Sequence, residues 1–321
     1  MILSGRVSSP MATPNGKTWA WSNITTEYFY SVYSARNKWI AGGGTNNGLY
    51  YSENGKVWKQ LSLKKGTFYS IYNANRIWVA ASNNGLYYSA DGEYWAQGNV
   101  TSGAFKDVYY ANGIWVAGGE EGLYYSEDGK SWTQSNITSY RVLAIYNANG
   151  IWVAACNNGL CASIDGKTWT SHDFPSIVCN SVYNANGIWV CSSSKGLYCS
   201  ENGENWNQSN ITTEYFNKIY NANGIWVACS ENNGLYYSED GKTWTQSNIT
   251  SGTFRYVYNA NGIWVACSYK GNGLYYSTDG KNWMQSNITT GYFNSIYNAN
   301  GIWVVCGDGN GLYYSESYIP S

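Results

Sequence analysis

An aspartate that recurs along this chain is the first candidate for a catalytic or metal-binding residue. It recurs at one position of a turn with the form Ser-x-Asp-Gly, as Asp91, Asp128, Asp165, Asp240 and Asp279. A carboxylate there could act as general acid, nucleophile or metal ligand. Asn15, Asn54 and Asn202 occupy the same position in other copies, and an amide keeps the hydrogen bond but loses the charge. We therefore expect a structural turn, in which Asp accepts backbone N–H groups, Gly supplies positive φ, and a Trp such as Trp244 anchors the hairpin.

Few other residues suit catalysis. His172 is the only histidine. A metal site with several histidines therefore cannot form within one chain, and a histidine-based triad could use only this residue. The segment His172-Asp173-Phe174 replaces a loop that is regular in other copies; both sequence drift and a special site remain open for it. We expect no enzyme, no metal site and no cofactor.

The elements that must position these residues come from one unit copied eight times. A Trp recurs from Trp39 to Trp303, within Ile-Trp-Val in every copy but the first, and a second Trp closes each Asp turn from Trp19 to Trp283. Both series step by 37 to 39 residues. Such a period indicates a repeat architecture. The copy around residue 220 predicts four strands of about six residues, at 216–221, 225–229, 234–238 and from Lys242 through Trp244. Asn-Gly between the first two predicts a tight hairpin, and no apolar period predicts a helix.

The two ends of the chain favour a closed ring over an open solenoid. The N-terminus supplies only a fourth strand, from Gly16 onward, and the C-terminus stops after a third strand at 311–315. Pairing these fragments would close a circle, and a solenoid does not require it. We predict an all-β fold, a single domain over residues 1–321: an eight-bladed β-propeller of four-stranded antiparallel blades, in which residues 16–24 complete the blade formed by 292–315.

The repeated turn resembles the Asp-box, or BNR repeat, of sialidase-like β-propellers, and the resemblance covers nearly the whole chain. One spacing departs from it, because Gly follows Asp directly here, as in 128–129. A sialidase-like site implies three arginines that meet on a substrate carboxylate. Here Arg36 and Arg76 fall in a hairpin turn, while Arg141 and Arg255 start strands near the opposite rim. The chain is identified as a non-enzymatic member of this superfamily.

Composition limits the classes of partner. Charged residues make up 12% of the chain and the net charge is -1, so there is no basic surface for nucleic acid. No apolar run is long enough for a membrane helix, and the first residues lack the features of a signal peptide. We expect no nucleic-acid partner and no membrane insertion, with virion or cell-surface association open.

The eight cysteines do not form a disulfide framework. Cys229, Cys267 and Cys306 share a repeat position that holds Gly, Ala or Ser in other copies, so we expect mostly free thiols and synthesis in a reducing compartment. The tripeptide Asn-Ile-Thr recurs at Asn23, Asn136, Asn210, Asn248 and Asn287. It is either a set of glycosylation acceptors or a product of duplication.

Variation among the copies is concentrated in two of the four connections. The first and third connections, Asn-Ala-Asn-Gly and Asp-Gly-Lys, are nearly invariant. The other two meet at the opposite rim, the variable rim, where we place binding because loops carry function on a rigid scaffold. Its candidate ligand-binding residues are Asn46, Asn47, Asn83, Asn84, Glu120, Asn157, Asn158, Asn232, Asn233, Tyr269 and Asn272.

Aromatic residues near the starts of first strands add to this rim. Either they face a ligand or they fill the seams between blades: Phe29, Phe68, Phe105, Tyr140, Phe216, Phe254 and Phe293. We predict a multivalent binding module that recognises glycan or a protein surface. The alternatives are a structural assembly component, which could include a homo-oligomer, and a glycoside hydrolase or lyase.

Overall fold

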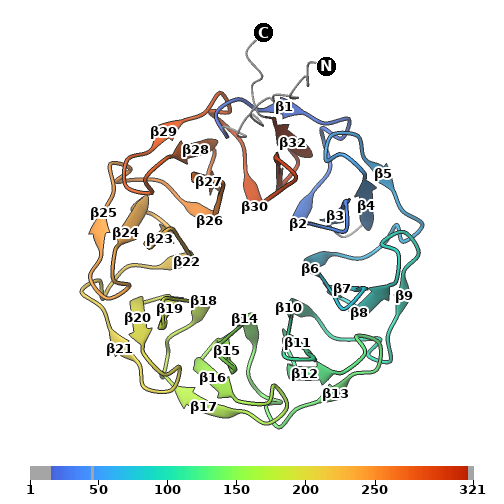
Figure 1. The fold of residues 1–321 in the computed structure, drawn as a ribbon, viewed down its shortest axis with the longest axis horizontal. Coiled ribbons are helices and arrows are strands. Elements are labelled where there is room, and N and C mark those ends of the chain that lie inside the picture. The colour runs from blue at the N-terminus through green and yellow to red at the C-terminus, as the bar shows by residue number, and fades with distance from the viewer. Residues whose placement is uncertain (1–15, 45–46, 317–321) are drawn as a thin grey trace, which may run out of the picture.

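A computed structural model describes residues 16–44 and 47–316, which form 32 strands and no helix. The strands build eight separate four-stranded antiparallel sheets arranged as blades around one axis (Figure 1). The prediction of an all-β, eight-bladed propeller is confirmed. In this part of the chain, no helix is long and apolar enough to cross a membrane.

The blades are numbered 1 to 8 in the order of their inner strands. The inner strands are β2 (Phe29–Ala35), β6 (Phe68–Ala74), β10 (Phe105–Ala111), β14 (Val142–Ala148), β18 (Cys179–Ala185), β22 (Phe216–Ala222), β26 (Phe254–Ala260) and β30 (Phe293–Ala299). The second strands are β3 (Lys38–Gly43), β7 (Ile77–Ser82), β11 (Ile114–Gly119), β15 (Ile151–Cys156), β19 (Ile188–Ser193), β23 (Ile225–Ser230), β27 (Ile263–Ser268) and β31 (Ile302–Gly307). The third strands are β4 (Leu49–Ser52), β8 (Gly85–Ser89), β12 (Gly122–Ser126), β16 (Gly159–Ser163), β20 (Gly196–Ser200), β24 (Leu235–Ser238), β28 (Leu274–Ser277) and β32 (Leu312–Ser315). The outer strands are β5 (Lys59–Gln60), β9 (Ala96–Gln97), β13 (Thr133–Gln134), β17 (Thr170–Asp173), β21 (Asn207–Gln208), β25 (Thr245–Gln246), β29 (Met284–Gln285) and, for blade 8, β1 (Ala20–Trp21).

The outer strands differ from the prediction in position and length. In blade 6, β25 begins after Trp244, not at Lys242. The backbone N–H groups of Lys242 and Thr243 donate to Asp240 at 2.8 and 2.7 Å. They are therefore committed to the turn and cannot join the strand ladder, which leaves a two-residue outer strand.

The N-terminal strand closes the ring. Strand β1 pairs antiparallel with β32, with Ala20 opposite Tyr314 and Trp21 opposite Tyr313, so the first and last coloured strands lie side by side (Figure 1). The Trp21 ring stacks on Tyr313, with centroids 3.8 Å apart. The prediction that the N-terminal segment completes the last blade is confirmed.

The core lies in the seams between neighbouring blades. Trp39 of blade 1, for example, packs in one cluster with Val304 and Cys306 of blade 8. All eight cysteines are buried free thiols, as predicted. The six phenylalanines that begin inner strands are at most 2% exposed, so the interpretation of these rings as ligand-facing is wrong. They are the first residues of inner strands, and burying them between blades removes a large apolar area from water.

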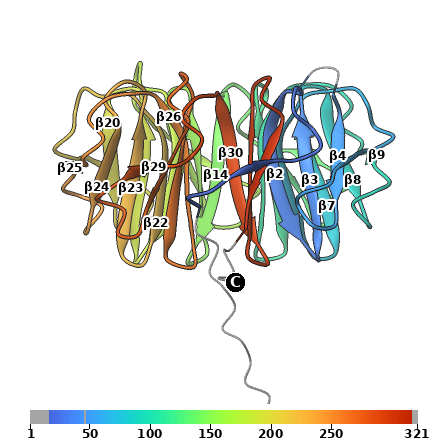
Figure 2. The same cartoon turned by 90° about the horizontal axis from the view of Figure 1, so that it is seen from above.

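Tight turns and Asp turns share one rim. Between β22 and β23, Asn223 and Gly224 have φ of 52° and 80°, the two positive values that a type I′ hairpin needs. In the side view, the strands run between two rims (Figure 2). The connections that follow the second and outer strands lie on the opposite rim, which is the variable rim.

Every inner strand carries a β-bulge near the variable rim. In β10 the register shifts between Phe105 and Asp107, so Lys106 has no partner in the ladder. The same shift follows the first residue of each inner strand. A bulge frees and redirects a side chain. The eight bulge residues are Tyr30, Tyr69, Lys106, Leu143, Asn180, Asn217, Arg255 and Asn294.

Candidate functional site: the variable rim and the central channel

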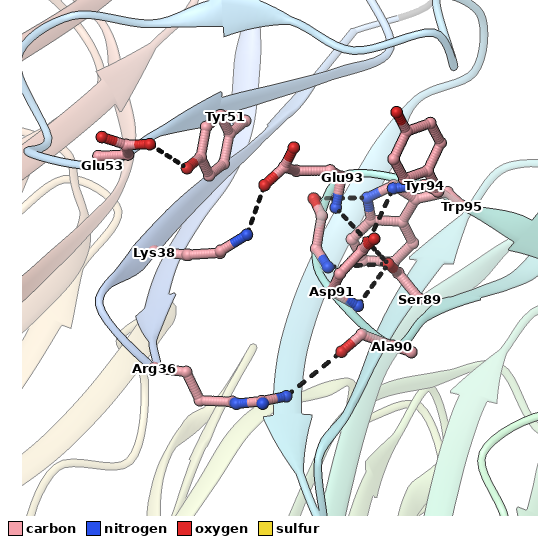
Figure 3. A network of polar contacts seen from close by, with 11 residues as sticks. Arg36, Lys38, Tyr51, Glu53, Ser89, Ala90, Asp91, Glu93, Tyr94 and Trp95 are labelled. Carbon is pink, nitrogen blue, oxygen red and sulfur yellow. Dashed lines mark hydrogen bonds and ion pairs between the residues drawn. The ribbon is translucent and has the colours of Figure 1, made fainter.

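The Asp turns are built as expected for a structural element. In blade 2, Asp91 accepts hydrogen bonds from Ser89 Oγ at 3.0 Å and from the N–H groups of Glu93 and Tyr94 at 2.8 and 2.9 Å (Figure 3). Asn54 makes the same backbone contacts at 2.9 and 3.0 Å. Partial burial works to raise the pKa of each carboxyl, but these donors outweigh it and hold the pKa below its usual value. The turn therefore uses a carboxylate and an amide alike.

Neighbouring Asp turns are joined by exposed ion pairs on this rim. Lys167 Nζ lies 2.7 Å from Glu127 of the preceding blade, and Lys242 lies 2.7 Å from Glu201. Blades 1 and 2 are joined differently, because Arg36 donates to the Ala90 carbonyl at 3.3 Å and Lys38 pairs with Glu93 (Figure 3). Exposed pairs contribute little stability. Glu201 and Lys242 also line a pocket of about 420 Å³ beside the Asn202 turn.

The asparagine of Asn-Ile-Thr is a clamp between blades. Asn210 accepts from the backbone N–H of Trp244 at 2.8 Å and donates to the carbonyl of the same residue at 2.9 Å. The same pair of bonds occurs at Asn23, Asn99, Asn136, Asn248 and Asn287. A clamp that holds the next blade explains why the tripeptide repeats, and its amide nitrogen is already engaged.

Two blades lack the clamp and show its effect. Ser62 and Asp173 stand where the clamp asparagine would precede Trp95 and Trp206. These two are half-buried, whereas the other six tryptophans of the Asp turns are at most 4% exposed. Loss of the clamp thus coincides with looser seating of the tryptophan.

The candidate asparagines lie on the variable rim, and several are engaged within their own loops. The Oδ1 atoms of Asn83 and Asn157 accept the N–H groups of Thr67 and Arg141 at 2.9 and 3.1 Å. Both asparagines thereby fix the entry to an inner strand. The candidate Asn158 is exposed on the same loop, and its backbone carbonyl accepts the N–H of Phe174 at 2.9 Å.

A second group of candidates holds the outer strand through the backbone. The carbonyls of Asn47, Asn84, Asn233 and Asn272 accept amide donors from glutamines such as Gln246, at 2.6 to 3.0 Å. Asn84 is exposed and the other three are half-buried, and the side chain of Asn233 donates to Glu214. Asn232 is exposed, and Asn46 lies outside the described residues.

Charged and aromatic candidates gather near the axis. Glu120 lies 2.9 Å from the Arg141 guanidinium and 3.8 Å from Lys106 Nζ. The Arg255 guanidinium lies 3.3 Å from the centre of the Tyr269 ring. Arg141 and Arg255 are thus occupied in separate contacts in blades 4 and 7.

One sector of the variable rim is rich in tyrosine, and sequence reasoning missed most of it. Tyr269 of blade 7 meets Tyr292 edge to face at 5.7 Å, and Tyr30 and Tyr69 lie 5.5 Å apart in blades 1 and 2. Tyr28 and Tyr292 are 53% and 48% exposed. We call these five residues, from consecutive blades 7, 8, 1 and 2, the aromatic arc. For Tyr30 and Tyr69 the sequence did contain a signal. They occupy the second residue of the inner strand, which differs among the copies and is Tyr, Lys, Leu, Asn or Arg.

The central channel is lined by a ring of eight tyrosines, one from each blade. Consecutive rings lie 4.5 to 5.4 Å apart around the full circle. Burial raises the pKa of members such as Tyr33, Tyr109 and Tyr220, so the hydroxyls stay neutral. The ring consists of Tyr33, Tyr72, Tyr109, Tyr146, Tyr183, Tyr220, Tyr258 and Tyr297. Between this ring and the bulge residues lies a cavity of about 460 Å³, lined by all eight blades.

The irregular loop of blade 4 forms its own small network. Tyr140 donates its hydroxyl to Asp173 at 2.6 Å, and β17 is longer than the other outer strands. His172 is half-buried, and its Nε2 has no hydrogen-bond partner within residues 16–44 and 47–316.

Comparison with known proteins establishes similarity of fold. No protein-family model matches the chain, and no curated protein matches its sequence. A computationally designed protein, Ika8, superposes with a TM-score of 0.76 at 9% identity over 94% of this chain and 99% of its own. A structure described as YCF48 bound to D1 peptide gives a TM-score of 0.64 at 14% identity over 97% and 100%. BamB from Moraxella catarrhalis gives 0.66 at 10% identity over 91% and 99%.

The chain is therefore an eight-bladed β-propeller that resembles designed propellers, YCF48 and BamB. At these identities the likeness concerns the fold alone.

Proposed function

We propose that the chain is a non-enzymatic binding module that recognises a protein surface through its variable rim. The observation that carries this is the contrast between the two rims: near-identical turns on one, and on the other diverse loops together with eight bulge residues of five types. A rigid ring that varies mainly at one rim is typical of a scaffold that displays contact residues.

The uneven distribution of side chains favours a protein partner over a repeated sugar. The phenylalanines that could have made eight similar pockets are buried. On this rim Tyr28 and Tyr292 of the aromatic arc are exposed, as is Tyr215 of blade 6, while blades 3 and 4 expose charges such as Glu120 and Arg141. Tyr and Arg are the residues that dominate protein interfaces. YCF48 is described as bound to a peptide, which supports a peptide or protein partner for the same fold.

Kinship with the Asp-box propellers belongs to this proposal as well. The Ser, Asp and Trp contacts of the turn support it, and the shortened Asp-Gly spacing separates this chain from the familiar form. A non-catalytic role agrees with turns that accept Asn in place of Asp.

The proposal is tested by screening the protein against a displayed peptide library and a glycan array in parallel. Peptide ligands should appear, and Tyr28→Ser with Tyr292→Ser should weaken their binding. Tyr94→Ser is the matched control, because Tyr94 is 78% exposed on the opposite rim. Hits confined to the glycan array, or binding lost in the Tyr94 variant alone, would contradict the proposal.

A further inference from the structure

Three charged residues line the central channel, and one of them, Lys106, is engaged by Glu120 and the Tyr69 ring. The other two have opposite charges, and the proposed rim function does not use them. They occupy the third residue of the inner strand, directly after the bulge. This position is Ser in blades 1, 2, 5 and 8, but Asp107 in blade 3 and Lys218 in blade 6. Both line the cavity. Blades 4 and 5 lie between their blades on the shorter way around the ring, so the two charges approach the axis from different sides.

Asp107 is held as a fixed acceptor. Its Oδ1 accepts from Ser70 Oγ at 2.8 Å and from the N–H of Val108 at 2.9 Å. Its Oδ2 accepts only from the N–H of Ile145, at 2.9 Å. Burial raises the pKa of this carboxyl, while the Ile145 N–H and the Lys218 charge oppose the rise. Because each carboxylate oxygen can accept two hydrogen bonds, Oδ2 has capacity for one more donor.

Lys218 has no such partners. Its ammonium lies 4.9 Å from the centre of the Tyr256 ring, and within the described residues it makes no hydrogen bond or ion pair. Burial lowers the pKa of this lysine, against the effect of Asp107. A half-buried ammonium with three unused donors is costly to keep in a protein. An anionic ligand would supply the missing acceptors.

We propose that the channel binds one small molecule that carries a carboxylate for Lys218 and a hydrogen-bond donor for Asp107. The tyrosine ring lines one end of the cavity, and the cavity of about 460 Å³ has room for a small polar ligand. A phosphate ester fits less well, because its nearly two negative charges would lie close to the Asp107 carboxylate, and Lys106 is already engaged by Glu120. This site is single and axial, so it goes beyond the proposed function and does not depend on it.

The experiment is calorimetric titration of the protein with galacturonate and γ-aminobutyrate. Both carry a carboxylate, and their donors are hydroxyl and ammonium groups respectively. Galactose lacks the carboxylate of galacturonate, and butyrate lacks the ammonium donor of γ-aminobutyrate. We expect at least one of the two acids to bind with 1:1 stoichiometry. Its matched analogue should bind about tenfold more weakly, as expected for loss of a charged hydrogen bond. Binding of galacturonate would indicate that Asp107 accepts from hydroxyl groups, and binding of γ-aminobutyrate would indicate that it accepts from an ammonium group.

Lys218→Met tests the assigned residue. It should lower the affinity for the acid about tenfold or more. The melting temperature should not fall, since an unpaired ammonium gives way to an apolar side chain of similar length. Lys242→Met is the control, because this lysine pairs with Glu201 on the opposite rim, and its variant should bind as the parent does. Failure of both acids to bind at millimolar concentration, or unchanged affinity in Lys218→Met, would overturn the proposal. Peptide binding on the rim is measured separately and is unaffected by either result.

Discussion

At Asp240 one carboxylate oxygen accepts three hydrogen bonds within its own turn, from the hydroxyl of Ser238 and the N–H groups of Lys242 and Thr243. Because Asn54 and Asn202 serve equally in other blades, we expect Asp240→Asn to leave stability nearly unchanged at neutral pH. Trp244→Ala should cost about 3–5 kcal/mol, since it empties a packed seam. Urea unfolding of both variants measures the contrast. If Asp240→Asn removed a binding activity from a stable protein, the structural role of the turn would be wrong.

The same turns predict a response to acid. The donors at Asp279, chiefly the N–H and side-chain amide of Asn282, hold its pKa at about 2 against the opposing effect of partial burial. A carboxyl with a lower pKa in the folded state adds stability above its unfolded pKa, and this stability is lost as pH falls through the folded value. The melting temperature of Asp279→Asn should therefore fall less than that of the parent between about pH 4 and pH 2. Equal slopes would contradict the prediction.

Adding a clamp asparagine should raise the stability of the protein, and removing one should lower it. Ser62 occupies the clamp position before Trp95, and its loop keeps the backbone bonds of the clamped blades, such as Leu49 N–H to Leu63 O at 3.0 Å. Ser62→Asn should then add two hydrogen bonds to Trp95 and raise the melting temperature. Asn210→Ser, the reverse change, should cost about 1–3 kcal/mol. Differential scanning calorimetry compares the two. A Ser62→Asn protein no more stable than the parent would show that the clamp contributes nothing in that blade.

At the scale of elements, the two-residue strand β1 closes the ring. Despite this length, it covers the edge of β32. The strand directly follows Trp19, which Asn287 clamps at 2.8 and 2.9 Å. Deleting residues 1–24 should expose that edge. We expect a lower melting temperature and aggregation by light scattering. A synthetic peptide of residues 16–24 should restore part of the loss. A deletion protein as stable and monodisperse as the parent would contradict the closed ring as the source of stability.

The bulges are the second element-level feature. One extra residue in each inner strand turns a side chain out of the ladder and towards the axis near the variable rim. As a result, Tyr30 and Tyr69 approach each other, and Lys106 reaches the ring of Tyr69 at 3.8 Å. The bulge thus converts a repetitive scaffold into a surface whose chemistry changes from blade to blade.

At the scale of the whole molecule, the two rims should separate binding from stability. Once a ligand is known, single substitutions at Asn232, Asn233 or Asn272 should weaken binding in small steps, because the contact is spread over several loops. Asn223→Ala on the opposite rim should lower stability instead, since its φ of 52° suits Asn and disfavours Ala. Affinity and melting temperature of each variant give the comparison. Complete loss of binding from one loop would point to a single dedicated site.

Local chemistry was enough to predict the architecture. The paired tryptophan series determined the number of blades, and complementary ends determined closure, because repeated units with exposed edges must pair with something. The sequence also indicated the structural roles of the Asn-Gly hairpin turns and of the Asp turns, in which Asn can replace Asp. Both kinds of turn depend on interactions within a few residues. The predicted start of the outer strand, at Lys242, was a few residues too early. The backbone N–H groups of Lys242 and Thr243 donate to Asp240 in the turn and therefore cannot pair with the neighbouring strand.

Only the tertiary structure decided which residues meet. The phenylalanines looked suited to a ligand, but the seams bury them, since packing between blades depends on neighbours about one repeat away. Asp107 and Lys218 are unremarkable in the sequence, and they share a cavity because ring closure brings the same strand of every blade to one axis. The sequence by itself thus determined the repeat, the turns and the closed ring, which depend on local and periodic interactions. The channel and the aromatic arc depend on contacts between distant blades, and those exist only once the ring is closed.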